Sequence, residues 1–260
     1  MVDNTGVIVP VISGLYGLAI GSFLNVVVYR VPAGLSVNRP RSHCPQCETD
    51  ICWYDNIPVV SWVLLRGECR RCTTRISTRY PAVELFTAIL FAVVGWSTGW
   101  SPELPAMLAF AAVLVALSII DIDTKTLPNK IIYPATAAAI ALLGGAAVLG
   151  GEPDRLIWIG AGGALGFGIL FVIWFVAPGG MGYGDVRLSG YLGLHLGYFG
   201  LGHVAVGLFL GFLSGAVGGL LLMVVAGRSR TSTIPFGPYL ALGAIVSVLY
   251  GDAILDAYLQ

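Results

Sequence analysis

LPAMLAFAAVLVALSII, residues Leu104–Ile120, decides the fold class of this chain, because it contains 17 consecutive residues without Asp, Glu, Lys or Arg. An apolar run of about 17–25 residues is long enough to cross a bilayer as a helix. The whole chain has the same character: 57% of its 260 residues are hydrophobic, 11% are charged, and its mean hydropathy is +0.84. A soluble domain carries about 25% charged residues. The sequence therefore predicts an all-α polytopic membrane protein.

Six further runs carry no charged residue and have lengths close to the same range. They are Val7–Val28, Leu85–Pro102, Ile131–Gly151, Leu156–Ala177, Val204–Gly227 and Thr231–Gly251. An eighth candidate, Leu188–Leu201, is shorter, rich in glycine and interrupted by His195. We therefore expect about eight transmembrane helices.

The basic residues are concentrated in one hydrophilic segment between the first two spans, which holds eight of the 14 lysines and arginines. They are Arg30, Arg39, Arg41, Arg66, Arg70, Arg71, Arg75 and Arg79. The positive-inside rule places this segment in the cytoplasm. With eight spans, Lys125, Lys130, Arg187, Arg228 and Arg230 also fall on the cytoplasmic side, and Arg155 is the one base outside. Both chain ends are then outside, and the first run, which lacks a basic n-region, is expected to be an uncleaved anchor.

Two C-x-x-C pairs lie in this segment, Cys44–Cys47 and Cys69–Cys72. Each pair places two thiolates within reach of one tetrahedral ion, so the two pairs predict a closed four-sulfur zinc site. Two disulfides are the alternative, which a reducing cytoplasm disfavours. A closed site has no open coordination position, so the expected zinc is structural. The fifth cysteine, Cys52, is expected to be a small apolar filler with no role.

Two aspartates stand where apolar runs meet the cytoplasmic side. Asp121 directly follows Leu104–Ile120, and Asp185 ends the glycine-rich stretch GMGYGD, residues Gly180–Asp185. Ionisable groups at the membrane margin are costly, which makes them candidates for function. The glycines suit a site where an extended substrate backbone lies against the enzyme. Gly182, Tyr183, Gly184 and Arg187 are therefore candidates for substrate binding or positioning.

If the helices that carry Asp121 and Asp185 pack together, the two carboxylates share a proton, and one acts as acid while the other acts as base. Such a pair activates water for attack on a peptide carbonyl. Helix capping is the structural alternative for each aspartate alone. Asp123 is a weaker candidate, Glu84 is at most a supporting group, and the three histidines show no clustering with carboxylates in the sequence.

Taken in order along the chain, these motifs resemble those of type IV prepilin peptidases, the bifunctional leader peptidases/N-methyltransferases of the GxGD aspartic class. The matching stretches are Gly21–Arg30, Cys44–Cys47, Trp53–Pro58, Cys69–Cys72, Arg79–Glu84, Asp121 with Leu127–Asn129, and Gly180–Asp185. One departure is Arg187, where the family commonly carries Lys. A fork of donors replaces a point charge there.

The resemblance implies that Asp121 and Asp185 are the catalytic pair of a protease in the bacterial plasma membrane. It implies cleavage of a basic leader from prepilin-like single-span proteins, after a glycine, at the cytoplasmic face. It also implies methylation of the new N-terminus with S-adenosylmethionine, for which we assign no binding residues. The lipid bilayer is a partner, and no nucleic-acid partner is expected. Three parts follow: an N-terminal span (1–29), a zinc-binding segment (30–80) and a polytopic peptidase domain (81–260).

Two other functions remain open. A proton-coupled transporter would use intramembrane carboxylates as a proton relay and glycine breaks as discontinuous helices. Against it, both aspartates are expected near one face, and no internal repeat is evident in the sequence. A zinc-ribbon docking protein without chemistry would need neither aspartate.

Overall fold

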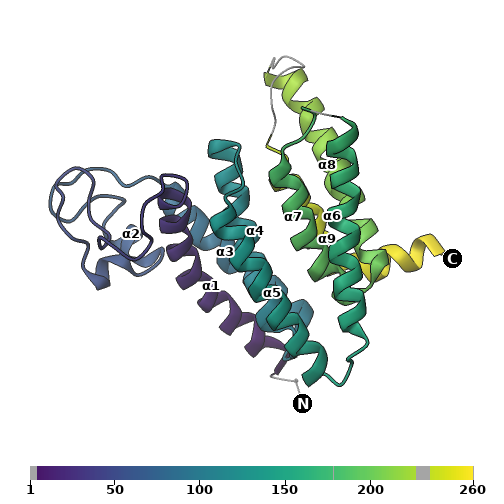
Figure 1. The fold of residues 1–260 in the computed structure, drawn as a ribbon. Coiled ribbons are helices and arrows are strands. Elements are labelled where there is room, and N and C mark those ends of the chain that lie inside the picture. The colour runs from purple at the N-terminus through teal and green to yellow at the C-terminus, as the bar shows by residue number, and fades with distance from the viewer. Residues whose placement is uncertain (1–4, 178, 227–234, 260) are drawn as a thin grey trace. The chain divides into compact units, whose positions relative to one another are not determined.

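The computed structural model describes residues 5–177, 179–226 and 235–259. Its described residues form helices and turns, with two isolated β-bridges as the only strand pairing (Figure 1). The chain divides into two compact units, Met1–Trp100 and Ser101–Gln260. Each unit is a helical assembly with its own site.

The first unit is built on the close packing of α1 (Thr5–Arg30) against α3 (Arg79–Thr98). Gly17 and Gly21 are four residues apart on α1 and face α3. A Cβ atom on Gly21 would lie 2.7 Å from the Glu84 Cα, and one on Gly17 would lie 2.8 Å from the Ala88 Cα. Small residues at this spacing let membrane helices approach until their backbones touch. Glycine is therefore required at both positions.

Between these helices, the chain forms the cysteine-containing segment, residues 31–78. It holds the short helices η1 (Trp53–Asn56) and α2 (Val60–Leu64). Among its residues only Cys44, Ser61 and Gly67 are buried. The segment therefore has almost no hydrophobic core of its own.

The second unit contains six helices, joined by short loops where the chain is described. They are α4 (Leu104–Thr124), α5 (Asn129–Leu149), α6 (Arg155–Val176), α7 (Tyr183–Phe199), α8 (Leu201–Ala226) and α9 (Gly237–Leu259). The helix break expected at Leu127-Pro128-Asn129 is present: α4 ends at Thr124 and α5 begins at Asn129. Pro128 is the residue just before α5, where its extended backbone and missing N–H cost nothing.

Glycine also sets the packing within the second unit. Gly162 and Gly166 on α6 meet Gly193 and Ser189 on α7, backbone against backbone. The Ser189 hydroxyl donates to the Gly166 carbonyl at 2.9 Å, across this contact. A similar contact joins α8 to α9, where a Cβ on Gly243 would lie 2.8 Å from the Gly211 Cα. These interfaces have no room for a side chain.

The helix α7 is the innermost helix of the second unit. It packs against α5, α6, α8 and α9, and its Tyr191 and His195 rings contact Phe110 of α4. The His195 ring stacks on Phe110 with centroids 4.1 Å apart, and its Nδ1 lies 3.1 Å from the Tyr191 carbonyl oxygen. Neither polar ring faces lipid, since both residues are at most 2% exposed. Burial inside protein explains why the sequence of this helix is less apolar than the other helices of the unit.

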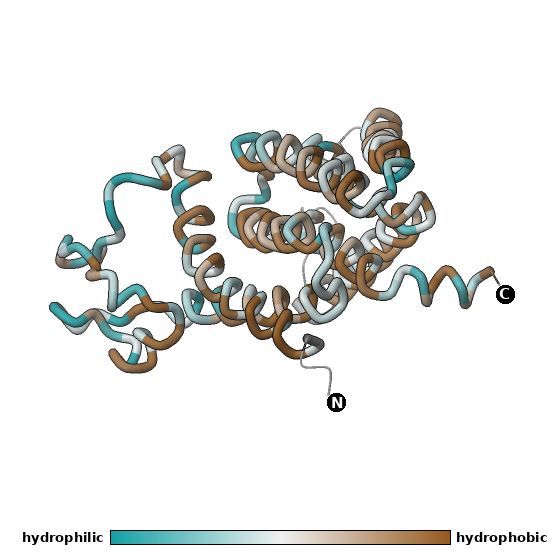
Figure 2. The backbone as a smooth tube through the Cα atoms, turned by 90° about the horizontal axis from the view of Figure 1, so that it is seen from below, coloured by the Kyte–Doolittle hydropathy of each residue, from teal (hydrophilic) through white to brown (hydrophobic). Residues whose placement is uncertain are grey.

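Seven helices among the described residues are long and apolar enough to cross a membrane: α1, α3, α4, α5, α6, α8 and α9. The eighth expected span falls on α7, which starts earlier, at Tyr183, and has 17 residues. Residue 227 and residues 231–234, which the predicted spans include, lie outside the described residues, as do Arg228 and Arg230. Figure 2 shows hydrophobic residues along the helices and hydrophilic ones gathered in the cysteine-containing segment. The prediction of an all-α polytopic membrane protein is confirmed.

The α6–α7 interface yields a paired prediction. Gly193→Ala adds a methyl group 2.8 Å from the Gly162 carbonyl carbon, and overpacking of this kind costs about 1–3 kcal/mol. Gly168→Ala, on α6, meets no atom within 4 Å, so it should leave stability unchanged or slightly raised. Thermal unfolding of both variants in detergent measures this difference. Equal melting temperatures would contradict the close contact.

Candidate functional site

Asp121 lies in the last turn of α4 and is 5% exposed. Its Oδ2 accepts a hydrogen bond from the Gly237 N–H, at 2.9 Å, where α9 begins. The start of a helix carries unpaired N–H groups and partial positive charge, so it stabilises a carboxylate. A Cβ on Gly237 would lie 2.9 Å from that oxygen, which leaves no room for a larger residue.

Asp185 lies in the first turn of α7 and is 8% exposed. Its Oδ2 accepts from the Gly182 N–H at 3.2 Å, and its own N–H donates to the Gly182 carbonyl at 3.1 Å. Asp185 therefore caps α7, which is the structural role that the sequence leaves open for it. A cap is normally solvated, whereas this carboxylate is buried, so capping alone does not account for its position.

Leu127 connects the two aspartates. Its side chain packs beside Gly184 at the start of α7 and beside Gly237 at the start of α9. A Cβ atom on either glycine would come within 3.4 Å of this side chain. Gly237 also lies against the Asp121 carboxylate, and Gly184 directly precedes Asp185 in the chain. The two carboxylates lie close enough for Asp121 to act electrostatically on Asp185. The structure therefore brings together two acids that are far apart in the sequence.

Aromatic rings hold the side chains around Asp185. The Tyr183 ring packs on Trp174 of α6 with centroids 5.1 Å apart. The Arg187 guanidinium lies over the Tyr183 ring at 5.2 Å and the Tyr133 ring at 6.0 Å. Its Nε donates to the Tyr183 carbonyl at 3.4 Å. Gly182 and Tyr183 are exposed beside the buried Asp185.

Gly237 is the residue of this site that the sequence analysis missed. Its signal is the stretch Pro235-Phe236-Gly237-Pro238, in which two prolines flank the glycine where a helix begins. Asp123, the weaker candidate, is exposed on the same turn as Asp121. Of the histidines, His203 lies 3.5 Å from Asp252, so the expectation that no histidine clusters with a carboxylate is wrong for His203.

The four paired cysteines form the second site, in the first unit. Their sulfur atoms all lie within 4.8 Å of one another, and the Sγ atoms of Cys44 and Cys72 are 3.7 Å apart. A zinc ion bound tetrahedrally at about 2.3 Å separates its sulfur ligands by about 3.8 Å. All five cysteines are free, so the disulfide alternative is not what the structure holds. The cluster fits a structural zinc, which would supply the core that residues 31–78 lack.

Two loops of the same design carry the ligands. In Cys44–Thr49 and in Cys69–Thr74 the first cysteine accepts an N–H from the residue four positions on and donates its own to the threonine that follows. The fourth-position residues, Glu48 and Thr73, have φ angles of 55° and 56°. Antiparallel bridges close each loop, His43 with Asp50 and Glu68 with Arg75. The loops are thus a small internal repeat, which the sequence analysis did not identify.

Hydrogen bonds inside the loops favour the thiolate form at three of the four cysteines, whereas the pKa of the Cys44 thiol is raised. The Thr49 hydroxyl lowers the pKa of the Cys47 thiol, and the Thr74 hydroxyl lowers the pKa of the Cys72 thiol. The backbone N–H of Cys72 lowers the pKa of the Cys69 thiol. Deprotonated sulfur is the form that coordinates zinc.

Comparisons with known proteins show the family of this chain. The Bacterial Peptidase A24 N-terminal domain matches residues 15–98, and the Type IV leader peptidase family matches residues 108–225. A prepilin leader peptidase/N-methyltransferase of Aeromonas salmonicida (strain A449) is 37% identical, over 95% of this chain and 92% of the relative. The protein of that name from Bacillus subtilis (strain 168) is 34% identical, over 95% of this chain and 96% of the relative. The chain belongs to the type IV leader peptidase family.

A third relative of the same name, from Myxococcus xanthus (strain DK1622), is 40% identical over 84% of this chain and 64% of its own length. No solved structure matches the chain. The resemblance stated from the motifs is thereby confirmed. In this member of the leader peptidase family, the N-terminal match contains the cysteine cluster, and the second match contains both aspartates.

Glu84 and Cys52 have definite places in this leader peptidase family member. Glu84 is buried on α3, and its Oε2 accepts the Val59 N–H at 2.7 Å, while its carboxylate also hydrogen-bonds Ser22. Val59 has a φ of 60°, a costly conformation for a β-branched residue that this bond stabilises. Cys52 is exposed, so the expectation that it is an apolar filler is wrong.

The metal centre yields a prediction with an internal control. Cys72→Ser removes one of four thiolates, so bound zinc should fall well below the one ion per chain expected for the wild type, and residues 31–78 should become protease-sensitive. Cys52→Ser should change neither property, because Cys52 lies outside the cluster. Elemental analysis and limited proteolysis of the purified proteins measure the two effects. Full zinc content in the Cys72 variant would contradict the assignment.

Proposed function

We propose that this protein is an intramembrane aspartic endopeptidase that removes the leader from prepilin-like proteins. The observation that carries this proposal is the pair of buried carboxylates, each hydrogen-bonded to an N–H at a helix start, with the Leu127 side chain packed beside Gly184 and Gly237 at the same two helix starts. The family and the names of the relatives support the same activity.

The chemistry requires the two acids to hold one proton between them. Two neighbouring carboxylates that repel each other do not both ionise cheaply, so one stays protonated. The ionised group takes a proton from water as the water oxygen attacks the peptide carbonyl. The protonated group then gives its proton to the leaving amine as the C–N bond breaks. Asp121 and Asp185 thereby serve as base and acid.

The substrate is a single-span precursor with a short basic leader in the cytoplasm, cut after a glycine. Its apolar helix lies in the same bilayer as the enzyme, so the membrane itself aligns the scissile bond with the carboxylates. The exposed stretch at Gly182 and Tyr183, together with Gly184 and Arg187, positions the backbone around that bond. The positive-inside rule applied to the arginine-rich segment supports a cytoplasmic location for the aspartates.

The same protein also methylates the new N-terminus, with S-adenosylmethionine as donor. The printed names of the relatives include this second activity. The four-cysteine zinc has no open position, so it acts on neither reaction directly.

Substituting the aspartates tests the peptidase. Asp121→Asn and Asp185→Asn should each lower leader cleavage by at least about 100-fold, since a general acid or base contributes about 10²–10⁴-fold. Asparagine keeps an oxygen that accepts the Gly237 or Gly182 N–H, so the fold should survive. Asp123→Asn, exposed two residues away, is the matched control and should cleave normally. Co-expression with a candidate prepilin reports the product size.

The same variants distinguish the peptidase from a docking protein and from a transporter. Normal cleavage by both asparagine variants would leave only a docking role. A transporter would be identified if the wild type cleaves no prepilin but carries protons across liposome membranes, and if either asparagine substitution abolishes this proton flux.

Methylation is tested separately with a cleaved pilin and labelled S-adenosylmethionine. The wild type should transfer label to the N-terminus of the pilin. Asp121→Asn should do so as well, because the substrate is already cleaved and the carboxylates are needed only for hydrolysis. Absence of transfer by a protein that still cleaves would remove methylation from the assignment.

A further inference from the structure

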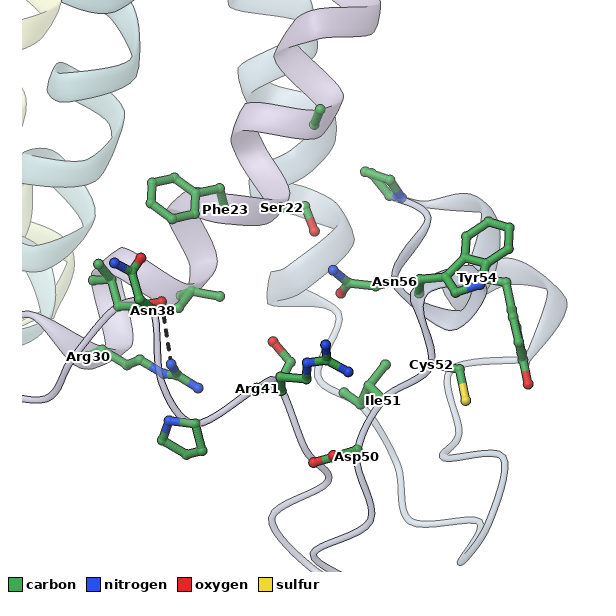
Figure 3. A pocket seen from close by; sticks show the side chains of 17 residues that line it. Ser22, Phe23, Arg30, Asn38, Arg41, Asp50, Ile51, Cys52, Tyr54 and Asn56 are labelled. Atoms are coloured by element: carbon green, nitrogen blue, oxygen red, sulfur yellow. Dashed lines mark hydrogen bonds between the residues drawn. The ribbon is translucent and has the colours of Figure 1, made fainter.

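An open cavity of about 850 Å³ lies in the first unit, outside the aspartate pair (Figure 3). The second half of α1 forms one wall, with Ser22, Phe23 and Val26, and residues 37–58 form the other. Sites for small molecules typically have volumes of about 300–1,000 Å³. The cavity is therefore of the right size for a nucleoside-sized ligand.

The lining combines three kinds of group. Arg41 and Asp50 carry opposite charges, Asn38 and Asn56 present amides, and the Trp53 and Tyr54 rings stand edge to face with centroids 5.7 Å apart. Arg30 is already engaged, since its Nη1 donates to the Ser36 carbonyl at 3.1 Å. The guanidinium of Arg41 has no ion-pair partner in the described part of the chain. Figure 3 shows Arg41 and Asn56 extending into the space between the two walls.

The metal centre holds the outer wall in two places. The backbone of Asp50 forms an antiparallel bridge with that of His43, the neighbour of Cys44. Arg70 lies between Cys69 and Cys72, and its Nε and Nη2 donate hydrogen bonds of 2.6–3.0 Å to the Asp55 carboxylate. Its guanidinium also lies over the Tyr54 ring. The first loop of the four-cysteine site thus fixes the backbone of the outer wall at Asp50, and the second loop contacts this wall at Tyr54. A structural zinc in this position would shape a binding site.

Glu84 forms contacts with both walls of the cavity. Its carboxylate hydrogen-bonds Ser22 on the α1 wall and the Val59 N–H, directly after Pro58 of the outer wall. A buried acid that joins the two walls keeps the cavity at a fixed width. The site is therefore built from three anchors: two metal-bearing loops and one carboxylate.

We propose that this cavity binds the methyl donor, S-adenosylmethionine. This inference rests on the proposed methyltransferase activity and gives that activity a location. The Arg41 guanidinium would take the carboxylate of the donor, and Asp50 its ammonium group or ribose hydroxyls. The Trp53 and Tyr54 rings would stack on adenine and attract the sulfonium charge.

The reaction at this site balances without a further reactant. The methyl carbon leaves the donor sulfur, which keeps the bonding electron pair and becomes a thioether. The amine nitrogen of the new N-terminus forms the new bond and loses a proton to solvent.

An anionic phospholipid headgroup is the competing occupant, because an arginine beside aromatic rings is also an interfacial pattern. Asp50 and the two asparagines favour the methyl donor. A phosphate would be repelled by the carboxylate of Asp50, whereas the donor carries cationic groups that this carboxylate attracts.

Cys52 provides a direct test, because its thiol is exposed and lines the cavity while the other four cysteines belong to the metal cluster. The full-length zinc-loaded protein in phosphatidylcholine nanodiscs is treated with N-ethylmaleimide, and alkylation of the Cys52 peptide is followed by mass spectrometry. Saturating S-adenosylmethionine or S-adenosylhomocysteine should slow alkylation several-fold. Adenosine and methionine, added separately, should protect less.

A matched pair of arginine variants locates the protection. Arg41 and Arg66 both stand three residues before the first cysteine of their loop, but only Arg41 lines the cavity. Arg41→Gln should abolish the protection and weaken equilibrium binding of labelled S-adenosylmethionine by about 10-fold or more, as expected for a lost charge-assisted hydrogen bond. Arg66→Gln should keep both properties.

Three outcomes would overturn the proposal. In the first, neither ligand protects Cys52 although the same preparation methylates a cleaved pilin, which places the donor elsewhere and leaves the methyltransferase intact. In the second, phosphatidylglycerol in the nanodiscs protects Cys52 and the methyl donor does not, which makes the cavity a lipid site. In the third, the protein neither methylates nor binds the labelled donor, and then the proposed methyltransferase function fails as well.

Discussion

The burial of two carboxylates at helix starts is the constraint on which the second unit depends. Removing an ionised carboxylate from water costs several kcal/mol even after the protein relaxes, and this cost applies to each of the two groups. A helix start returns about 0.3–1 kcal/mol and up to about 2 kcal/mol in a partly buried geometry. The N–H groups of Gly237 and Gly182 therefore offset only part of the cost. The remaining cost is relieved when the pair holds a proton, which is the state that the proposed hydrolysis uses.

Glycine makes this arrangement possible by letting helices approach closely. The α6–α7 contact, with Gly162 and Gly193 backbone against backbone, leaves α7 surrounded by other helices. Since α7 carries Asp185 in its first turn, its position fixes that carboxylate. The α8–α9 contact at Gly243 does the same for α9, whose first N–H binds Asp121. Helix interfaces in which glycine backbones touch have few alternative packings. They therefore suit a site that holds two acids at a fixed separation.

Much of this was predictable from the sequence, and the exceptions have physical causes. Charge-free runs such as Leu104–Ile120 predict spans because lipid tolerates little else, and C-x-x-C pairs predict a metal site because their spacing matches one ion. The bounds of α7 were harder to predict from apolar residues, because a helix buried in protein can carry polar residues such as Ser189 and His195. Gly237 was missed because its role is a backbone N–H, which any non-proline residue offers; only its contact with Asp121 shows why glycine is needed. The role of Glu84 was hidden for a similar reason, because its partner is the backbone of Val59.

The two units divide the chemistry according to what each is able to hold rigid. Residues 31–78 bury only three of their side chains or glycines, so hydrophobic packing does not fix them and a metal with four thiolates does. That closed site offers no water or substrate a ligand position, and hydrolysis therefore needs a different pair of groups. The membrane helices hold the two buried aspartates, which we propose for this role, on backbones that packing already fixes. In return, the metal-held segment is free to present polar side chains such as Arg41 and Asp50 around an open cavity, which a tightly packed apolar bundle has no means to do. A methyl-donor site of the kind we propose and a peptidase in one chain thus require both kinds of rigidity, and each unit of this protein provides one.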